Sequence, residues 1–113
     1  MTAQQCRAAV WARDDGRDRA SGHLLARWSL FASLQGEVHH LKGRRVKPEW
    51  KTDPDHQILL SRENHRLATG VWGGKLLTCW DPEDPTQPAT DATRPILFIR
   101  RDAKGVELWR TIR

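Results

Sequence analysis

Three histidines provide the clearest chemical signal in this chain. His39 and His40 are adjacent at the end of residues 36–41, whose alternating apolar and polar side chains predict a strand. His65 lies in residues 61–70, which have the pattern of a short helix. Neighbouring side chains of a strand point to opposite faces, so one of the adjacent imidazoles can bind a metal ion while the other faces a different atom. A divalent ion beside a second imidazole can hydrolyse a phosphodiester, because the ion offsets developing charge while the imidazole takes a proton from water.

Two strands and one helix must position these histidines. Residues 57–60 form a second strand-like run that leads directly into the helix. Ser61 is a suitable residue to begin that helix, and Gly70 is a suitable residue to end it. Residues 42–55 connect the two strands, and such a long connection is often functional.

The same residues resemble the core of the HNH endonucleases, whose fold is a β-hairpin and a helix around one metal ion. The resemblance is carried by residues 37–41 (Glu-Val-His-His-Leu), 53–60 (Asp-Pro-Asp-His-Gln-Ile-Leu-Leu) and 64–66 (Asn-His-Arg), in that order. Residues 12–22 resemble the lead-in segment of the family, so the likeness covers residues 10–70. It implies an α+β fold with a ββα-metal core.

The resemblance also implies a role for each histidine of the core. His40 is the general base, and His39 and His65 are the ligands of the metal ion. His56 falls where the family has the Asn that braces the loop and the base, and a histidine can still donate a hydrogen bond to a carbonyl there. Two imidazoles make a softer, less anionic site than one carboxylate and one imidazole. We therefore expect one divalent ion, with manganese, nickel, cobalt or zinc favoured over magnesium.

Many members of the family hold a structural zinc ion with four cysteines. The matching positions here are Asp18, Ser21, Ser61 and Asn64, and none is a thiolate, so no structural zinc is expected. We expect packing of large apolar side chains to replace it. The candidates are Trp11, Trp28, Leu30, Phe31 and Leu34.

The net charge of +5 favours a polyanionic partner, and we expect double-stranded DNA. Arginine outnumbers lysine by 14 to 5, and its planar guanidinium group suits phosphate oxygens. The alternative for such charges is a solvated surface without a partner. The cations nearest the histidines are the expected DNA contacts: Lys42, Arg44, Arg45, Arg62 and Arg66.

The chain of 113 residues is expected to form one domain, with the nuclease-like core at residues 10–70 and a small antiparallel β extension at residues 71–113. The remaining expectations follow from local patterns. They are helices at residues 2–13 and 24–34, strands at 75–80, 95–101 and 106–112, a turn at 102–105, and a mobile loop at 81–94.

Cys6 and Cys79 form no disulfide framework, and no segment has the apolar length needed to cross a bilayer. The first residues lack the apolar core of a signal peptide. We therefore expect a cytoplasmic protein of a prokaryote or phage that works alone, as a homodimer or beside a larger protein partner.

These patterns predict a metal-dependent endonuclease that hydrolyses DNA phosphodiester bonds, by nicking or double-strand cutting. The main alternative is a DNA-binding module that keeps the fold and the basic surface without turnover, because His56 and the missing cysteines depart from the family pattern. A third class is an interaction domain whose histidines only hold zinc, although such a domain would not require the flanking arginines.

Overall fold

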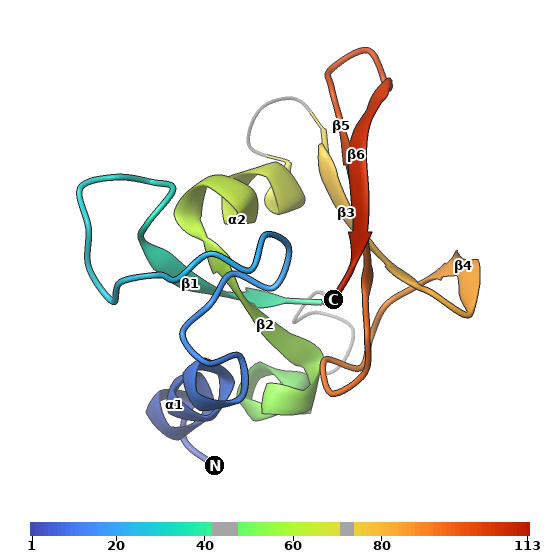
Figure 1. Ribbon diagram of the computed structural model, residues 1–113. Coiled ribbons are helices and arrows are strands. Elements are labelled where there is room, and N and C mark those ends of the chain that lie inside the picture. The colour runs from blue at the N-terminus through green and yellow to red at the C-terminus, as the bar shows by residue number, and fades with distance from the viewer. Residues whose placement is uncertain (42–47, 71–73) are drawn as a thin grey trace.

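Figure 1 shows a computed structural model of the chain, which describes residues 1–41, 48–70 and 74–113. Its helices, short 3-10 helices (η) and antiparallel strands confirm the α+β class at that level. In chain order the elements are α1 (Ala3–Arg13), β1 (Gly36–His40), η1 (Pro48–Thr52), η2 (Pro54–His56), β2 (Gln57–Ser61), α2 (Arg62–Thr69), β3 (Leu77–Asp81), β4 (Asp84–Pro88), β5 (Leu97–Arg101) and β6 (Glu107–Ile112).

Strands β1 and β2 form an antiparallel pair, and α2 follows β2 without a break, as predicted. The register places His39 opposite Ile58. The Ser61 hydroxyl caps α2 by accepting a hydrogen bond from the Asn64 N–H at 3.0 Å. Gly70 ends the helix with a φ of 86°, a left-handed conformation that favours glycine. The histidines of β1 and α2 are therefore carried by one strand–strand–helix unit.

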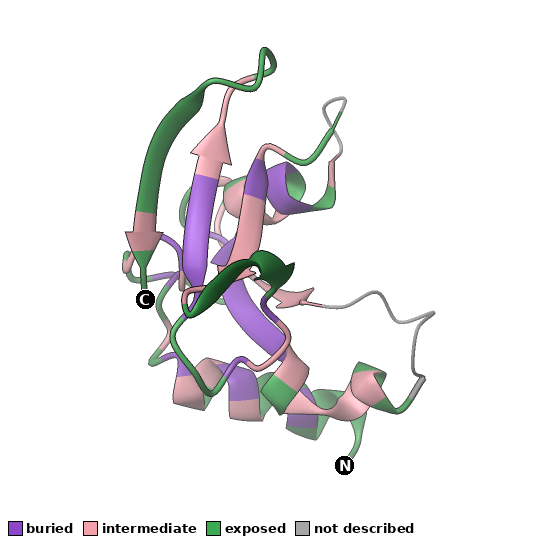
Figure 2. Cartoon of the chain, turned by 90° about the vertical axis from the view of Figure 1, so that its right-hand side faces the viewer, coloured by how far each residue is buried: buried purple, intermediate pink, exposed green. Residues whose placement is uncertain are grey.

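Strand β2 is the centre of the fold, because all five of its residues are buried. Ile58 and Leu60 belong to a core cluster with Phe98 of β5, while Leu59 packs on the opposite side with Val10 of α1. Figure 2 shows this buried strand in purple between the helices and the C-terminal strands. Since β2 is covered on both faces, the partly exposed β1 beside it carries the polar chemistry.

Helix α1 confirms the first predicted helix. Thr2 and Gln5 form a capping box, in which each side chain accepts a hydrogen bond from the backbone N–H of the other. Cys6 and Val10 are its buried residues. The other side chains of α1 can therefore line a surface beside the β1–β2 hairpin.

The C-terminal residues form an antiparallel sheet with the strand order β4-β3-β5-β6, as the predicted β extension requires. The predicted turn at residues 102–105 joins β5 to β6. The expectation of a loop throughout residues 81–94 was wrong, because β4 lies within it and pairs with β3. This strand is exposed and contains Pro85 and Pro88, residues that a sheet tolerates at its edge.

Arg19 fastens this second sheet to the lead-in segment. Its guanidinium donates hydrogen bonds to the carbonyls of Ala92 at 2.8 Å and Arg94 at 3.2 Å, and it lies 3.1 Å from the buried carboxylate of Asp14. The Asp14 carboxylate in turn accepts a hydrogen bond from the Leu59 N–H of β2. One charged network therefore joins the two sheets.

The helix predicted at residues 24–34 is not formed, and these residues make turns and isolated bridges instead. Ala26 pairs with Gln35 as one of those bridges, which closes the segment into a loop. Trp28 and Phe31 are 74% and 67% exposed, so their helical spacing does not mark a buried face. Helix formation depends on burial of an apolar face, and none of the described elements covers that face here. Across the described part of the chain, no helix has the length and apolarity to span a membrane.

Candidate metal site and its surroundings

His39 and His65 face each other across the hairpin and helix, with ring centroids 5.3 Å apart and an interplanar angle of 71°. Metal–nitrogen bonds of about 2.0–2.1 Å place two imidazoles on one tetrahedral ion with their centroids roughly 5 Å apart. The observed spacing therefore fits two ligands of a single ion.

Burial, together with the nearby His65, His40 and Lys75, lowers the pKa of His39 from its usual value to about 3. His39 is therefore neutral at pH 7. A neutral imidazole is the form that binds metal, so the electrostatic surroundings suit a ligand.

Glu37 was not recognised in the sequence as a site residue. One of its carboxylate oxygens lies 3.6 Å from Nδ1 of His65 and 3.5 Å from Nε of Arg62. A carboxylate beside one ring nitrogen orients an imidazole and leaves the other nitrogen for the ion. Its position in the sequence could have identified Glu37 as a site residue. Glu37 precedes His39 by two residues, so the two side chains lie on the same face of the strand.

The described residues contain no group of three or more His, Cys, Asp or Glu side chains placed to hold an ion. His39 and His65 would therefore hold it as a pair, with water or substrate oxygens completing its shell. Catalytic metal sites characteristically leave such positions open. The arrangement suits a site in which the substrate itself approaches the ion.

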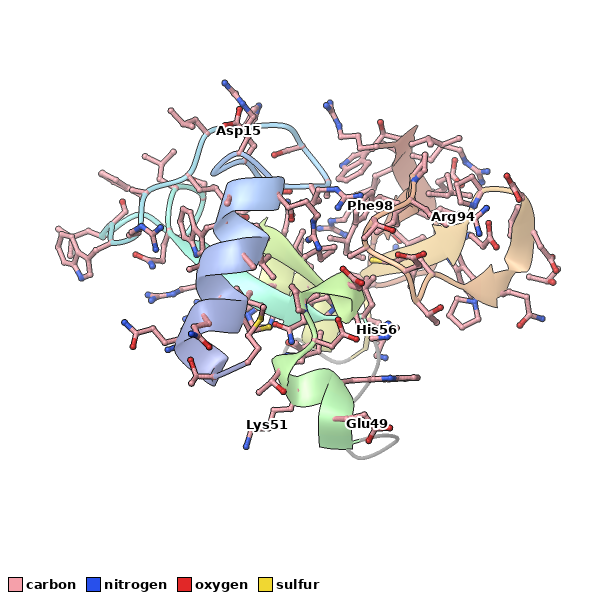
Figure 3. All side chains as sticks on the ribbon, turned by 90° about the horizontal axis from the view of Figure 1, so that it is seen from below. Asp15, Glu49, Lys51, His56, Arg94 and Phe98 are labelled. Atoms are coloured by element: carbon pink, nitrogen blue, oxygen red, sulfur yellow. The ribbon has the colours of Figure 1, made fainter. Side chains whose placement is uncertain are left out.

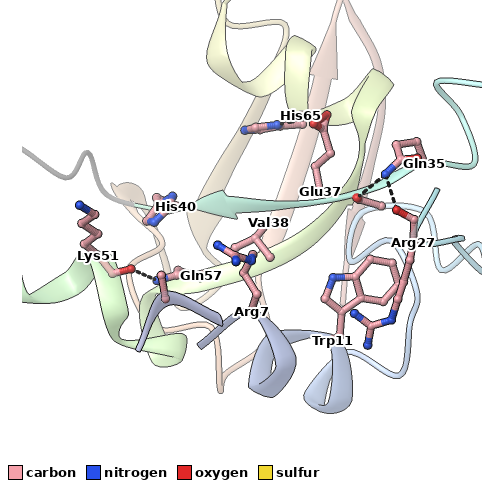
Figure 4. A pocket seen from close by; sticks show the side chains of 12 residues that line it. Arg7, Trp11, Arg27, Gln35, Glu37, Val38, His40, Lys51, Gln57 and His65 are labelled. Atoms are coloured by element: carbon pink, nitrogen blue, oxygen red, sulfur yellow. Dashed lines mark hydrogen bonds and ion pairs between the residues drawn. The ribbon is translucent and has the colours of Figure 1, made fainter. Parts of the chain in front are cut away.

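His40 lies on the other face of β1 and lines a pocket of about 520 Å³ between α1 and the hairpin. We call this pocket the α1 groove; Figure 4 shows it from close by. Side chains from both faces of β1 reach it, because Glu37 and His65 also contribute to its lining. The residues that line it include Arg7, Trp11, Arg27, Glu37, His40 and Lys51.

The structure does not bring the His56 ring to the histidine pair. Its Nδ1 is 2.6 Å from the carbonyl of Thr90, and its ring stacks on Trp50 with a centroid distance of 4.5 Å. Figure 3 shows His56 where the η1–η2 segment meets the C-terminal strands. The backbone of His56 does brace the strand, since its carbonyl accepts a hydrogen bond from the Leu41 N–H, one residue beyond His40.

The cations predicted to contact DNA have different positions. Lys42, Arg44 and Arg45 lie outside the described residues. Arg62 of α2 is partly buried and forms an ion pair with Glu37, while Arg66 of the same helix is exposed. The cations of the α1 groove were missed, because they are far apart in sequence and meet only in the fold.

Asp18, Ser21, Ser61 and Asn64, the positions expected to match zinc cysteines, meet around the Asp18 carboxylate. Oδ1 of Asp18 accepts hydrogen bonds from the N–H groups of Ala20 at 2.7 Å and Ser21 at 3.0 Å. Its Oδ2 accepts from the Ser61 N–H at 2.8 Å and from Nδ2 of Asn64 at 2.9 Å. Asp18 is only 1% exposed, so these hydrogen bonds satisfy a buried charge.

The expectation that apolar packing replaces the zinc is therefore wrong for most of its candidates. Trp28, Leu30, Phe31 and Leu34 are exposed, and only Trp11 packs against a core cluster. The hydrogen bonds of Asp18 instead connect the lead-in segment to the start of α2.

Comparisons of this chain with protein-family models, with curated proteins and with solved structures find no match.

Proposed function

We propose that this chain is a metal-dependent endonuclease that hydrolyses DNA phosphodiester bonds in the manner of the HNH family. The observation that carries the proposal is the 5.3 Å spacing of the His39 and His65 rings, with His40 of the same strand lining a pocket to which His65 also contributes. The meeting of the four zinc-cysteine positions around Asp18 also supports the family resemblance.

In the proposed reaction, His40 accepts a proton from water while the water oxygen forms a bond to phosphorus. The phosphorus–O3′ bond breaks with its electron pair on O3′, which then takes a proton from solvent. A divalent ion held by His39 and His65 supplies stabilisation for the charge on the phosphate and the departing oxygen. Glu37 orients His65, and we propose that manganese, nickel, cobalt or zinc supports faster cleavage than magnesium.

Nicking of supercoiled plasmid DNA in each of these metals tests the proposal. His40→Ala should lower the nicking rate by about 10²–10⁴-fold while metal and DNA affinity are retained. His39→Ala and His65→Ala should instead weaken metal binding. His23→Ala is the matched control, because His23 is exposed and does not line the α1 groove. Equal nicking rates for His40→Ala and the parent would remove His40 from the role of base.

A DNA-binding module without turnover is the second candidate. It is favoured by the side chain of His56, which contacts Thr90 and Trp50 where the family pattern has an Asn bracing the base. Salt-dependent DNA binding without cleavage in any of the metals would support this candidate over the nuclease. The cytoplasmic setting and a homodimer or larger partner stay predictions from the sequence.

A further inference from the structure

The α1 groove gathers positive charge from three separate parts of the chain. Arg7 belongs to α1, Arg27 to the loop before β1, and Lys51 to η1, and all three side chains are exposed. They line the same pocket as His40 (Figure 4). Three cations from elements distant in sequence thus share one groove with the proposed base.

These charges are open to an external anion. Among the residues that the structure describes, neither Arg7 nor Lys51 forms an ion pair, whereas Arg19 is paired with a buried carboxylate. The acidic side chain in the lining, Glu37, is already beside Arg62 and His65. The groove therefore presents a net positive surface.

The wall around Arg27 is built from close contacts. Its guanidinium lies over the Trp11 ring, 4.6 Å from the centroid, which covers the face of the group and leaves its N–H edge for hydrogen bonding. A Cβ atom at Gly36 would overlap the same indole, so glycine lets the ring lie directly on β1. The buried amide of Gln35 donates a hydrogen bond to the Arg27 carbonyl at 2.8 Å.

The chemistry of the groove matches a phosphodiester backbone. Its volume of about 520 Å³ is lined by two guanidinium groups and one ammonium group, which bind phosphate oxygens without reading base sequence. Figure 4 shows Lys51 and His40 at one end, Arg27 and Trp11 at the other, and Arg7 between them. Cations spread along a groove suit a chain of phosphates better than one isolated anion.

We propose that one strand of DNA crosses the hairpin on the α1 side, with its phosphates on Arg7, Arg27 and Lys51. The location of the cut beside His40 rests on the function proposed above, but the binding surface does not. DNA contacts would thus extend to a face of the hairpin opposite the one where α2 carries Arg62 and Arg66.

The test is binding of a fluorescent DNA duplex, measured by anisotropy over a range of salt concentrations with a chelator present. For the double variant Arg7→Ala/Lys51→Ala, the slope of log affinity against log salt should become shallower by about 2, one unit for each lost phosphate contact. Lys104→Ala is the matched control, because it removes one charge from the exposed turn between β5 and β6. Arg27 is kept, because it packs on Trp11.

Parent-like affinity and salt slope in the double variant would overturn the inference, whatever the nicking assay shows. If the double variant loses DNA binding and the parent does not nick plasmid, the inference about the groove stands and the nuclease proposal is refuted. If the double variant melts at a lower temperature than the parent, the single variants Arg7→Ala and Lys51→Ala serve instead. Each should keep the parent's melting temperature and make the slope of log affinity against log salt shallower by about 1. Tighter, equally groove-dependent binding of an RNA duplex would overturn the assignment to DNA.

Discussion

Replacement of Asp18 by asparagine should destabilise the fold severely. The carboxylate accepts hydrogen bonds at both oxygens from a total of four donors, at 2.7 to 3.0 Å. An asparagine can accept at one atom only, so its NH₂ group would face two of the donors. Loss of two hydrogen bonds to a charged acceptor, at about 1.5–3 kcal/mol each, gives a cost of about 3–6 kcal/mol. That is a large fraction of the roughly 5–15 kcal/mol that holds a typical domain.

Urea unfolding followed by circular dichroism measures the change. The control is Asp15→Asn, which makes the same chemical change at the surface (Figure 3). The Asp15 side chain is 90% exposed and 3.8 Å from Arg17, so its replacement should alter the free energy of unfolding by less than about 0.5 kcal/mol. A loss below about 1 kcal/mol in Asp18→Asn would refute the view that this carboxylate joins the lead-in segment to α2.

The reverse experiment would convert the same site to a zinc site. The quadruple variant Asp18→Cys/Ser21→Cys/Ser61→Cys/Asn64→Cys should bind one zinc ion with four sulfur ligands, because Ser21, Ser61 and Asn64 all hydrogen-bond to Asp18 and so lie close to it. Cobalt substitution gives a visible spectrum for tetrahedral thiolate coordination. Absence of metal binding in a folded variant would weigh against the alignment with the HNH family.

Three further outcomes are expected. Gly36→Ala should lower the free energy of unfolding by about 1–3 kcal/mol in urea titrations, because its Cβ would overlap Trp11; an unchanged value would contradict that contact. In metal-free protein, the pKa of about 3 for His39 lies below its unfolded value, so the unfolded chain binds the extra proton. The free energy of unfolding should therefore decrease as the pH is lowered from about 6.5 towards about 3. His39→Gln should flatten this dependence in urea titrations repeated across that pH range. Trp28→Ser should leave the melting temperature within a few degrees of the parent, because the side chain is 74% exposed; a large drop in calorimetry would show that it is buried in solution.

The hairpin and α2 could be predicted because local signals agree there. Alternation in β1, the apolar run of β2, and the caps Ser61 and Gly70 all point to the same unit. The helix expected at residues 24–34 failed because spacing alone does not say whether another element will cover the apolar side chains. Strand β4 was missed because its exposed, proline-containing sequence has little strand character, and pairing with β3 supplies what local preference lacks.

Only some residues of the candidate site could be predicted from the sequence. His39 and His65 were recognisable from residue type and order, and the structure places their rings together. Arg7 and Lys51 were not, because their convergence depends on how α1 and η1 pack beside the hairpin. The sequence pattern indicated only that Asp18 is not a thiolate, although a carboxylate can hold the same segments together through hydrogen bonds.

The Asp18 cluster also has a practical consequence. In a protein whose scaffold depends on cysteine-bound zinc, stripping divalent ions removes the architecture together with the reaction centre. Here the corresponding junction is held by hydrogen bonds to Asp18 in place of an ion, so dialysis against EDTA should yield a folded preparation without the proposed cleavage activity. Adding back one ion at a time would then report the chemistry of the histidine pair without interference from refolding.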